Sequence, residues 1–299
     1  MADLTLFYCD HHDIPLPPGH KFPLPKYRMT RELIERDGRF RLVRSPFAEL
    51  ANIERVHDPG YIRNFLEGTL DRSVLRRIGF PWSKELVSRT LASVGGTLAA
   101  THHAMASGLG GTLAGGTHHA FRNEGSGFCV FNDLAIAVEW VRAEYALSRI
   151  AIVDLDVHQG DGTAAIFDRD SGVFTLSLHG ARNFPFRKQR SRLDFEFEDG
   201  TTENEYLPVL DRALSSVREF APELIFFQSG VDSLQSDRLG RLALSHEGLA
   251  CRDKLVLSYA KSAGIPIVIT LGGGYSEPLE LTAMAHAQTF RIAAETFGA

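Results

Sequence analysis

The chain has 299 residues, of which 44% are hydrophobic and 23% charged, a composition typical of a folded globular protein with a substantial core. Its formal net charge of −5 argues against a surface that binds nucleic acid directly. The three cysteines lie far apart and form no disulfide framework, which favours a cytoplasmic protein. No apolar stretch approaches the roughly 18 residues that a membrane span needs, and we expect no signal peptide.

Apolar runs and helical patterns alternate along the chain. The runs expected to form buried parallel strands are 4–8, 151–155, 173–178, 224–228 and 265–271. The helical patterns cover 26–36, 83–107, 132–146, 163–168, 205–220, 246–263 and 279–296. Residues 13–26 hold five prolines and are expected to form an extended surface loop. Since no linker or repeat divides the chain, we expect residues 1–299 to form one α/β domain with a parallel sheet covered on both faces.

Polar side chains follow several of the predicted strands at the points where these strands end. Asp156 and His158 come after one strand, Asp232 after another and Tyr275 after a third. His119 precedes the helix predicted at 132–146. Because the chemistry of parallel sheets gathers at the carboxyl edge, we expect these side chains to converge there.

The segment 154–158 alternates polar and apolar residues, which places Asp156 and His158 on the same side of an extended chain. With Asp232 they make three protein ligands and leave a fourth position open, as in catalytic zinc sites. Aspartates at strand ends also cap helices or form turns, which is the alternative reading of Asp156 or Asp232 alone. Gly160 stands where a second, bridging carboxylate could lie, so one metal ion is expected. An oxygen and nitrogen set of this kind also accepts iron(II).

Two adjacent histidines, His118 and His119, follow a glycine pair. Each needs a carboxylate to fix its tautomer, and Asp154 and Asp161 are the acids left over after metal ligation. We therefore pair His118 with Asp154 and His119 with Asp161. One histidine then takes a proton from the attacking water and gives it to the leaving amine, while the other stabilises the transition state.

Three glycines precede Tyr275 after a buried strand. They let the backbone approach a ligand closely, and the tyrosine hydroxyl can donate to a carbonyl oxygen that gains negative charge. The alternative is a tight turn with a half-buried tyrosine.

Along almost its full length the chain resembles the histone deacetylase superfamily. The motifs that carry the resemblance are GGTHHAF (115–121), GFCVFNDLAIA (127–137), VDLDVHQGDGT (153–163), TLSLHG (175–180), GVDSLQSDRLG (230–240) and LGGGYS (271–276). Segments 20–34 and 78–90 look like the class IV type and its bacterial relatives. The resemblance implies the arginase/deacetylase fold, a three-layer αβα domain with a largely parallel sheet of about eight strands.

The resemblance also implies roles that agree with those reached above. It implies zinc on Asp156, His158 and Asp232, with His119 as general base and acid, His118 as its electrostatic partner, and Tyr275 as the residue that polarises the carbonyl.

For the substrate, the resemblance implies a tunnel for acyl-lysine walled by Gly127, Phe128 and Phe184. Residues 79–82 lack the acid with which class I members hold the substrate backbone. Leu239 falls where relatives that act on acetylated polyamines carry a glutamate, which counts against a polyamine substrate.

Family members often carry structural potassium or sodium ions. The matching positions for one ion are Asp154, Asp156, His158, Ser177 and Leu178, and those for part of a second are Phe167, Asp170 and Val173.

The leading hypothesis is zinc-dependent removal of an acetyl or longer acyl group from N-acyl-lysine. The second is deacetylation of a small acylated amine or metabolite. The third is a binding protein for acylated ligands that does not catalyse, which would require a missing ligand, base or tyrosine. None of these residues is missing from the sequence.

Overall fold

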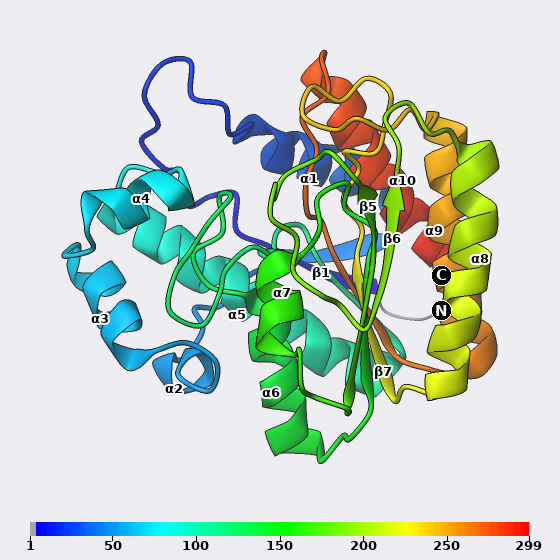
Figure 1. Ribbon diagram of the computed structural model, residues 1–299, viewed down its shortest axis with the longest axis horizontal. Coiled ribbons are helices and arrows are strands. Elements are labelled where there is room, and N and C mark those ends of the chain that lie inside the picture. Colours follow the sequence, from blue (N-terminus) through cyan, green and yellow to red (C-terminus); the bar gives the residue numbers. More distant parts are fainter. Residues whose placement is uncertain (1–3, 299) are drawn as a thin grey trace.

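One sheet of eight strands runs through the computed structural model, which describes residues 4–298. The strands are β1 (Leu4–Tyr8), β2 (Phe40–Arg44), β3 (Leu109–Thr112), β4 (Ile150–Asp154), β5 (Val173–Gly180), β6 (Leu193–Phe197), β7 (Leu224–Gln228) and β8 (Ile267–Thr270). Their order is β2-β1-β3-β8-β7-β4-β5-β6, and each neighbouring pair is parallel. Figure 1 shows β4's neighbours β5 and β7 near the middle of the molecule. The predicted α/β class with a parallel sheet is confirmed.

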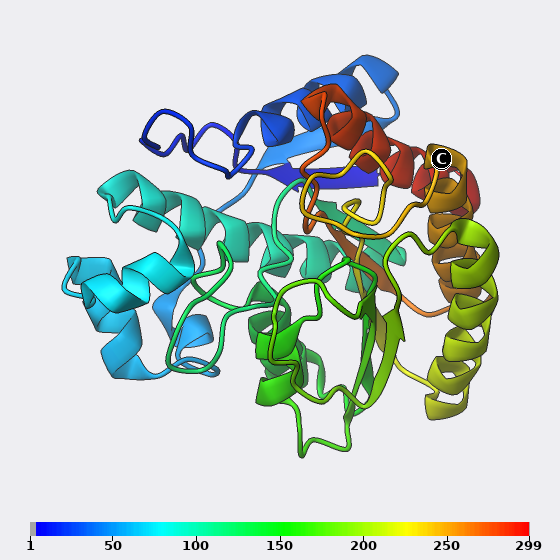
Figure 2. The same cartoon turned by 45° about the horizontal axis from the view of Figure 1, so that its top comes forward.

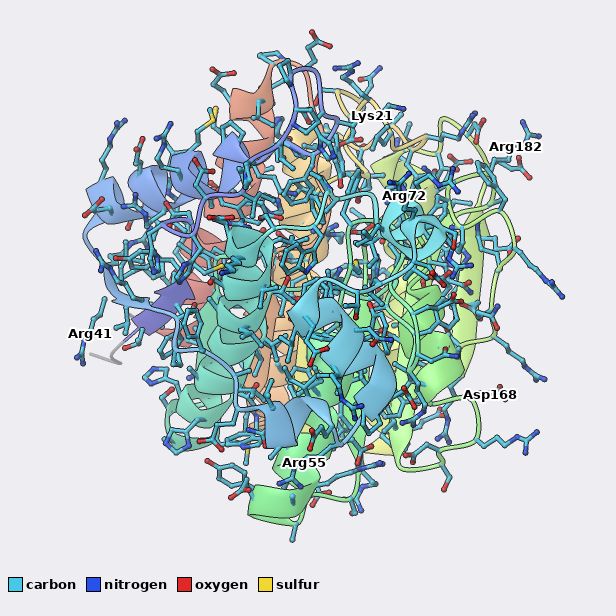
Figure 3. All side chains as sticks on the ribbon, turned by 90° about the vertical axis from the view of Figure 1, so that its left-hand side faces the viewer. Lys21, Arg41, Arg55, Arg72, Asp168 and Arg182 are labelled. Carbon is cyan, nitrogen blue, oxygen red and sulfur yellow. The ribbon has the colours of Figure 1, made fainter. Side chains whose placement is uncertain are left out.

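Helices cover both faces of the sheet. They are α1 (Pro25–Asp37), α2 (Leu50–Ile53), α3 (Pro59–Glu67), α4 (Arg72–Ile78), α5 (Lys84–Ser107), α6 (Asp133–Tyr145), α7 (Asp161–Ile166), α8 (Glu203–Phe220), α9 (His246–Ala263) and α10 (Leu279–Phe297). One face packs against α1, α8, α9 and α10, and the other against α5, α6 and α7 (Figures 1 and 2). The short helices α2 to α4 lie outside α5; of the residues labelled in Figure 3, Arg55 follows the end of α2 and Arg72 begins α4.

The alternation of side chains along β4 explains why the sheet needs both helical layers. Ala151 and Val153 belong to the core against α8 and α9, whereas Ile150 and Ile152 belong to the core against α5 and α6. All four are almost completely buried. Successive residues of a strand point to opposite faces, so an unbroken apolar run is stable only between two apolar layers. Full burial of each large aliphatic side chain contributes about 1.5–3 kcal/mol.

Three strands and three short helices were missed by the sequence reading, namely β2, β3, β6 and α2 to α4. The strand β3 has the sequence LGGT, and glycine is depleted in strands, which hid it. A Cβ at Gly110 would lie 2.0 Å from the carbonyl oxygen of Ala100 in α5, so the helix packs closely here only because this residue is glycine. The strand β6 is half-exposed at the edge of the sheet and lacks a continuous apolar run.

The prediction of a surface loop over residues 13–26 is wrong at two places. Ile14 is buried, and α1 already begins at Pro25, with Lys26 only 1% exposed. Proline is favoured in the first turn of a helix, where no backbone N–H is needed. The prolines therefore marked a helix start as well as a loop.

Within residues 4–298, no helix is long and apolar enough to cross a membrane.

Candidate active site

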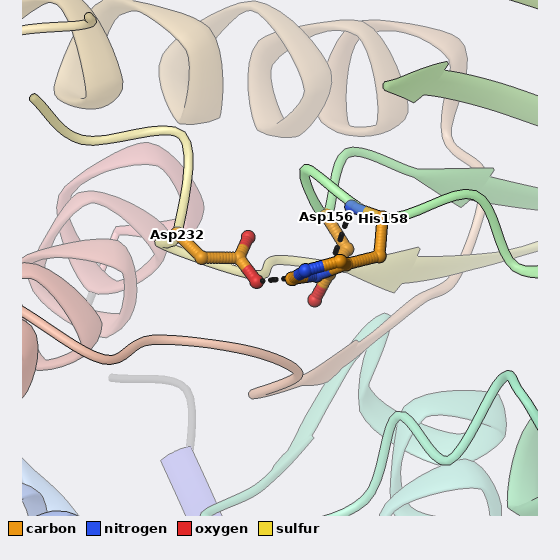
Figure 4. A group of neighbouring side chains, drawn as sticks. All are labelled: Asp156, His158 and Asp232. Carbon is orange, nitrogen blue, oxygen red and sulfur yellow. Dashed lines mark hydrogen bonds and ion pairs between the residues drawn. The ribbon is translucent and has the colours of Figure 1, made fainter. Parts of the chain in front are cut away.

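Asp156, His158 and Asp232 lie together beyond the carboxyl ends of β4 and β7 (Figure 4). The Nδ1 atom of His158 is 2.9 Å from Oδ1 of Asp156 and 3.0 Å from Oδ2 of Asp232. One candidate ligand atom from each residue lies within 4.8 Å of the other two. We call these three residues the metal-ligand group.

Backbone N–H groups orient both carboxylates of the metal-ligand group. Asp232 accepts a hydrogen bond from the N–H of Val157 at 2.8 Å, and Asp156 accepts one from the N–H of Gly273 at 2.7 Å. A Cβ at Gly273 would lie 1.9 Å from Asp232, so glycine is required for this approach. Fixed carboxylates of this kind are typical of sites whose ligands are held by a second layer of hydrogen bonds.

The electrostatics of the metal-ligand group call for a cation. Both carboxylates are almost completely buried. Burial raises the pKa of Asp232 to about 7, and the nearby Asp156 carboxylate acts in the same direction. Burial alone would lower the pKa of His158, but its hydrogen bonds to the two carboxylates raise that pKa to about 10. Two buried acids around one imidazole fit a divalent ion with nitrogen and oxygen preference, such as zinc.

The strand β4 ends at Asp154, one residue before the predicted end, yet the predicted alternation continues past it. Leu155 and Val157 are fully buried in the core, while Asp156 and His158 point into the site. Burial of Leu155 and Val157 thus fixes the side of the chain on which Asp156 and His158 lie.

The two histidines are held as the sequence predicts. His118 Nδ1 lies 2.7 Å from Oδ2 of Asp154, and His119 Nδ1 lies 2.6 Å from Oδ1 of Asp161. Their Nε2 atoms are 3.1 Å apart. His119 Nε2 is therefore not held by an acid, whereas its Nδ1 is.

The two rings differ in their electrostatic environment. For His118, burial lowers the pKa, but the charges of Asp154 and Asp156 outweigh burial and raise it to about 9. For His119, burial and the charge of His118 lower the pKa to about 4. The surroundings thus favour the charged form of His118 and the neutral form of His119, a division that suits general acid and base catalysis.

Asn132 is a positioning residue that the sequence reading missed. It caps α6 by accepting from the N–H of Ala135 at 3.0 Å, and its Nδ2 donates to the carbonyl of Ala120 at 3.1 Å and to Thr163 Oγ1 at 3.0 Å. It thus joins the segment after the two histidines to the start of α7. An Asn directly before a helix was a visible capping signal.

Arg252 is a second missed residue. It is completely buried in α9 and pairs with Asp253 at 2.7 Å. Its Nη1 donates to the carbonyl of Leu155 at 3.1 Å and to that of Gly230 at 2.6 Å. These carbonyls belong to the two loops that carry the metal-ligand group, so Arg252 holds the loops together. A lone arginine on a predicted helix gives no sequence signal for such a role.

Tyr275 is half-buried and lines the cavity of the site together with Gly272 and Gly273. Its backbone N–H donates to Asp237 at 2.6 Å, which anchors the turn. Burial raises the pKa of Tyr275 well above its usual range, so the hydroxyl keeps its proton and can donate it in a hydrogen bond.

The side chain of Lys26 was placed on the surface by the sequence reading but lines the same cavity. Its Nζ donates to the carbonyl of Gly272 at 3.0 Å and lies 5.3 Å from the centre of the Tyr275 ring. The hydrogen bond holds the glycine turn, and the cation faces the π-system of the tyrosine.

The residues predicted to wall the tunnel lie beside His119. The ring of Phe184 meets the His119 ring edge to face, with centroids 4.9 Å apart. A Cβ at Gly127 would lie 2.7 Å from His119, so glycine allows this approach, and Phe128 follows with a φ of 64°. A left-handed backbone at a bulky residue costs roughly 1–2 kcal/mol and is typical of functional sites. Leu239 lies outside the cavity, in a surface groove that also touches Tyr275.

The residues predicted to bind monovalent cations are only partly close together. Asp154 and Ser177 face each other across β4 and β5, near Asp156, His158 and Leu178. The second group, Phe167, Asp170 and Val173, forms a turn in which both oxygens of Asp170 bind Arg142. Both cation sites stay predictions.

The sequence profile of the histone deacetylase domain matches residues 20–291. A protein of Picosynechococcus sp. is 43% identical over 95% of this chain and 96% of its own length. Histone deacetylase 2 of Arabidopsis thaliana is 34% identical over 76% of this chain and 56% of its own length. The histone deacetylase-like amidohydrolase of Pseudomonas aeruginosa is 32% identical over 54% of this chain and 46% of its own length. The matches thus span about half the length of these two named relatives.

Among solved structures, acetylpolyamine aminohydrolase from Burkholderia pseudomallei has a TM-score of 0.80 to this chain. The match covers 98% of this chain and 99% of that one, at 20% sequence identity. This likeness confirms the predicted arginase/deacetylase fold.

Proposed function

The chain belongs to the histone deacetylase family of amidohydrolases, and from this we propose that it removes an acyl group from N-acyl-lysine with the help of a divalent metal ion. The observation that carries the proposal is one cavity in which two histidine–aspartate pairs face the metal-ligand group and Tyr275. These are the parts that hydrolysis of an amide requires.

A zinc ion on Asp156, His158 and Asp232 would supply Lewis-acid polarisation of the carbonyl and lower the pKa of water. The donor set also suits iron(II). In the proposed reaction His119 Nε2 takes a proton from the water that attacks the carbonyl carbon. The same proton goes to the lysine Nε as the C–N bond breaks, and the new carboxyl group passes its own proton to the amine, so that a carboxylate and an ammonium group are released.

Three further residues take part in this reaction beside His119. Asp161 keeps the ring oriented through Nδ1, and charged His118 stabilises the negative charge that develops nearby. The hydroxyl of Tyr275 donates to the carbonyl oxygen as that oxygen gains charge.

The size of the cavity favours short acyl groups. It holds about 100 Å³, whereas pockets for drug-sized ligands hold roughly 300–1,000 Å³. A long fatty chain would need the walls to move. The class IV resemblance alone is compatible with long acyl chains. Because the cavity is small, we propose acyl groups of about two to five carbons.

The second candidate substrate is a small acylated amine, and the likeness to an acetylpolyamine aminohydrolase supports it through the fold alone. The groove beside Tyr275 argues against a polycation. Lys21 and Leu239 line it, and its acid, Glu277, is paired with Arg238 at 3.4 Å. A polyamine would find no free carboxylate among these lining residues.

We further propose that the protein works in the cytoplasm, since its cysteines Cys9, Cys129 and Cys251 are all free thiols.

The test is hydrolysis of one lysine peptide carrying acetyl, butyryl, octanoyl or myristoyl groups, next to an acetylated polyamine, with and without a hydroxamate that binds zinc. We expect hydroxamate-sensitive hydrolysis of the acetyl and butyryl peptides and little of the octanoyl and myristoyl peptides. Hydrolysis of the polyamine alone would contradict the lysine assignment but keep the reaction class. No hydrolysis by folded, metal-loaded protein would contradict both.

A further inference from the structure

The cavity has an open side and a buried side. Next to His119, Phe184 contacts Phe186, which is 89% exposed, so this side leads to the surface. The opposite side reaches between α1 and α5, where the lining side chains are buried. The apolar ones are Ile14, Phe80, Leu86, Val94 and Phe131. We call this buried side the acyl chamber, because an acyl group bound at the metal-ligand group through its carbonyl would extend into it.

Two cations also line the acyl chamber, Lys26 and Arg89, which are 1% and 6% exposed. Both face the ring of Tyr27. Nζ of Lys26 is 5.2 Å and Cζ of Arg89 is 4.5 Å from the ring centre. Both cations therefore lie beside one aromatic ring and line the same cavity.

Neither cation has a carboxylate partner within ion-pair distance among residues 4–298. Lys26 donates to backbone carbonyls of Gly272 and Gly274, at 3.0 and 3.5 Å. The hydrogen bonds of Arg89 to backbone all come from Nη1, which donates to Cys9 at 3.4 Å and to His12 at 3.1 Å. Carbonyl oxygens accept the hydrogen bonds of the two cations but carry no negative charge that would neutralise them.

This arrangement is unusual in energetic terms. Buried charges are normally paired, because an isolated cation in a low-dielectric interior is strongly destabilising. Three carboxylates attract Lys26 at longer range. Asp232 and Asp156 belong to the metal-ligand group, and Asp237 accepts hydrogen bonds from three backbone N–H groups, including that of Tyr275. A chamber with apolar walls and two uncompensated cations is complementary to a short chain that ends in a carboxylate.

We propose that the preferred acyl group is a dicarboxylic half-amide, such as succinyl or glutaryl, whose free carboxylate binds Lys26 and Arg89. The inference rests on the proposed function. The reaction balances as a hydrolysis: the amide C–N bond breaks, and water gives its OH to the acyl carbon and its proton to the lysine Nε. The new carboxyl group then gives its proton to the freed amine, so that a dicarboxylate and an ammonium group result. No oxidant or co-reactant is needed.

The test compares acyl groups of equal length on one lysine peptide, butyryl with succinyl and pentanoyl with glutaryl. The enzyme should have a kcat/KM roughly tenfold to a hundredfold higher for the acidic member of each pair, the factor expected for a hydrogen bond to a charged group. Arg89→Met, which keeps the length of the side chain, should reduce the ratio of acidic to neutral kcat/KM by a similar factor. Arg89→Lys should retain part of the ratio, and Arg190→Met, at an exposed arginine, should retain all of it.

Inhibition by free acids tests the same point in the unaltered enzyme, in case Arg89→Met does not fold. Succinate and glutarate should inhibit at lower concentrations than butyrate and pentanoate. A preference for the neutral acyl group in both pairs would overturn this inference and leave the proposed function standing. Equal inhibition by all four acids would also overturn it, because the cations would then serve only the carboxylate that hydrolysis releases. No hydrolysis of any acyl peptide by metal-loaded enzyme would overturn both proposals.

Discussion

His118 and His119 face each other through Nε2 atoms 3.1 Å apart, while each ring is held at Nδ1 by its own aspartate. The two carboxylates differ in what else surrounds them. Burial lowers the pKa of His118, but Asp154 and Asp156 outweigh burial and raise it, whereas burial and the charge of His118 lower the pKa of His119. Adjacent residues of one type thus have pKa values shifted in opposite directions.

Replacing the general base should remove chemistry while leaving substrate binding in place. We expect His119→Ala to lower kcat by about 10²- to 10⁴-fold, because proton transfer to and from a positioned base contributes that much. KM should change by less than about threefold. Steady-state kinetics on the best acyl peptide measure both constants. An equal loss in His118→Ala with a normal rate in His119→Ala would reverse the assignment of the two rings.

The hydroxyl of Tyr275 should act on the transition state. Tyr275→Phe keeps the ring against Lys26 and removes only the donor, so we expect kcat to fall by about 10²- to 10³-fold. Binding of a hydroxamate should weaken far less, as measured by calorimetry. If Tyr275→Phe retains full turnover, another group polarises the carbonyl.

The Arg252 side chain should contribute both to the free energy of unfolding and to the affinity for zinc. Arg252→Met leaves Asp253 as an unpaired buried acid and frees the carbonyls of Leu155 and Gly230. Removing one partner of a buried pair costs about 3–5 kcal/mol of the free energy of unfolding. Loss of such supporting contacts typically lowers metal affinity by about 10- to 100-fold. Urea unfolding and zinc competition with a chelator measure the two effects.

The matched control for Arg252 is Arg218→Met, at an arginine on α8 that also faces an aromatic ring but makes no ion pair among the described residues. Both quantities should stay near the wild-type values in this control. Unchanged zinc affinity in a folded Arg252→Met protein would mean that the loops hold their geometry without the guanidinium.

His57 should make the fold less stable in acid. It is 2% exposed, and its Nε2 accepts a hydrogen bond from the N–H of Asn132 at 2.9 Å, which requires a neutral ring. Burial lowers the pKa of His57 from 6.5 to about 4. Above pH 6.5 both folded and unfolded states are neutral and the group contributes nothing. As the pH falls from 6.5 to about 4, only the unfolded state takes up the proton, so up to about 3 kcal/mol of stability is lost.

Urea unfolding of metal-free protein at several pH values measures this loss. His57→Gln offers an acceptor that does not titrate, so its stability should fall less steeply between pH 6.5 and 4. Identical slopes for the two proteins would show that His57 does not cause the acid sensitivity.

The sequence predicted correctly those features that depend on a local pattern of residues. The apolar run of β4, the alternation that turns Asp156 and His158 to one side, and the glycines before Tyr275 are all local, and each led to the right element. The pairing of His118 with Asp154 followed from counting acids that had no other task, and the geometry agrees.

Long-range contacts between unlike elements could not be predicted in this way. Lys26 follows a proline-rich loop, and lysine is mostly exposed in proteins, so nothing local indicates its burial beside Tyr275. Arg252 depends on carbonyls far away in sequence. The strand β3 could not be predicted from its sequence, because Gly110 is required by the close approach of α5 and does not itself favour a strand.

The most direct test of metal-dependent deacylation is turnover of an acetyl- or butyryl-lysine peptide by wild-type protein and Asp232→Asn, each first stripped of metal and then titrated with zinc. We predict that stripped wild-type protein is inactive and regains activity at one zinc ion per chain. Asp232→Asn should stay folded by circular dichroism, bind zinc far more weakly and remain inactive. Full activity of metal-stripped Asp232→Asn would contradict the role assigned to Asp156, His158 and Asp232.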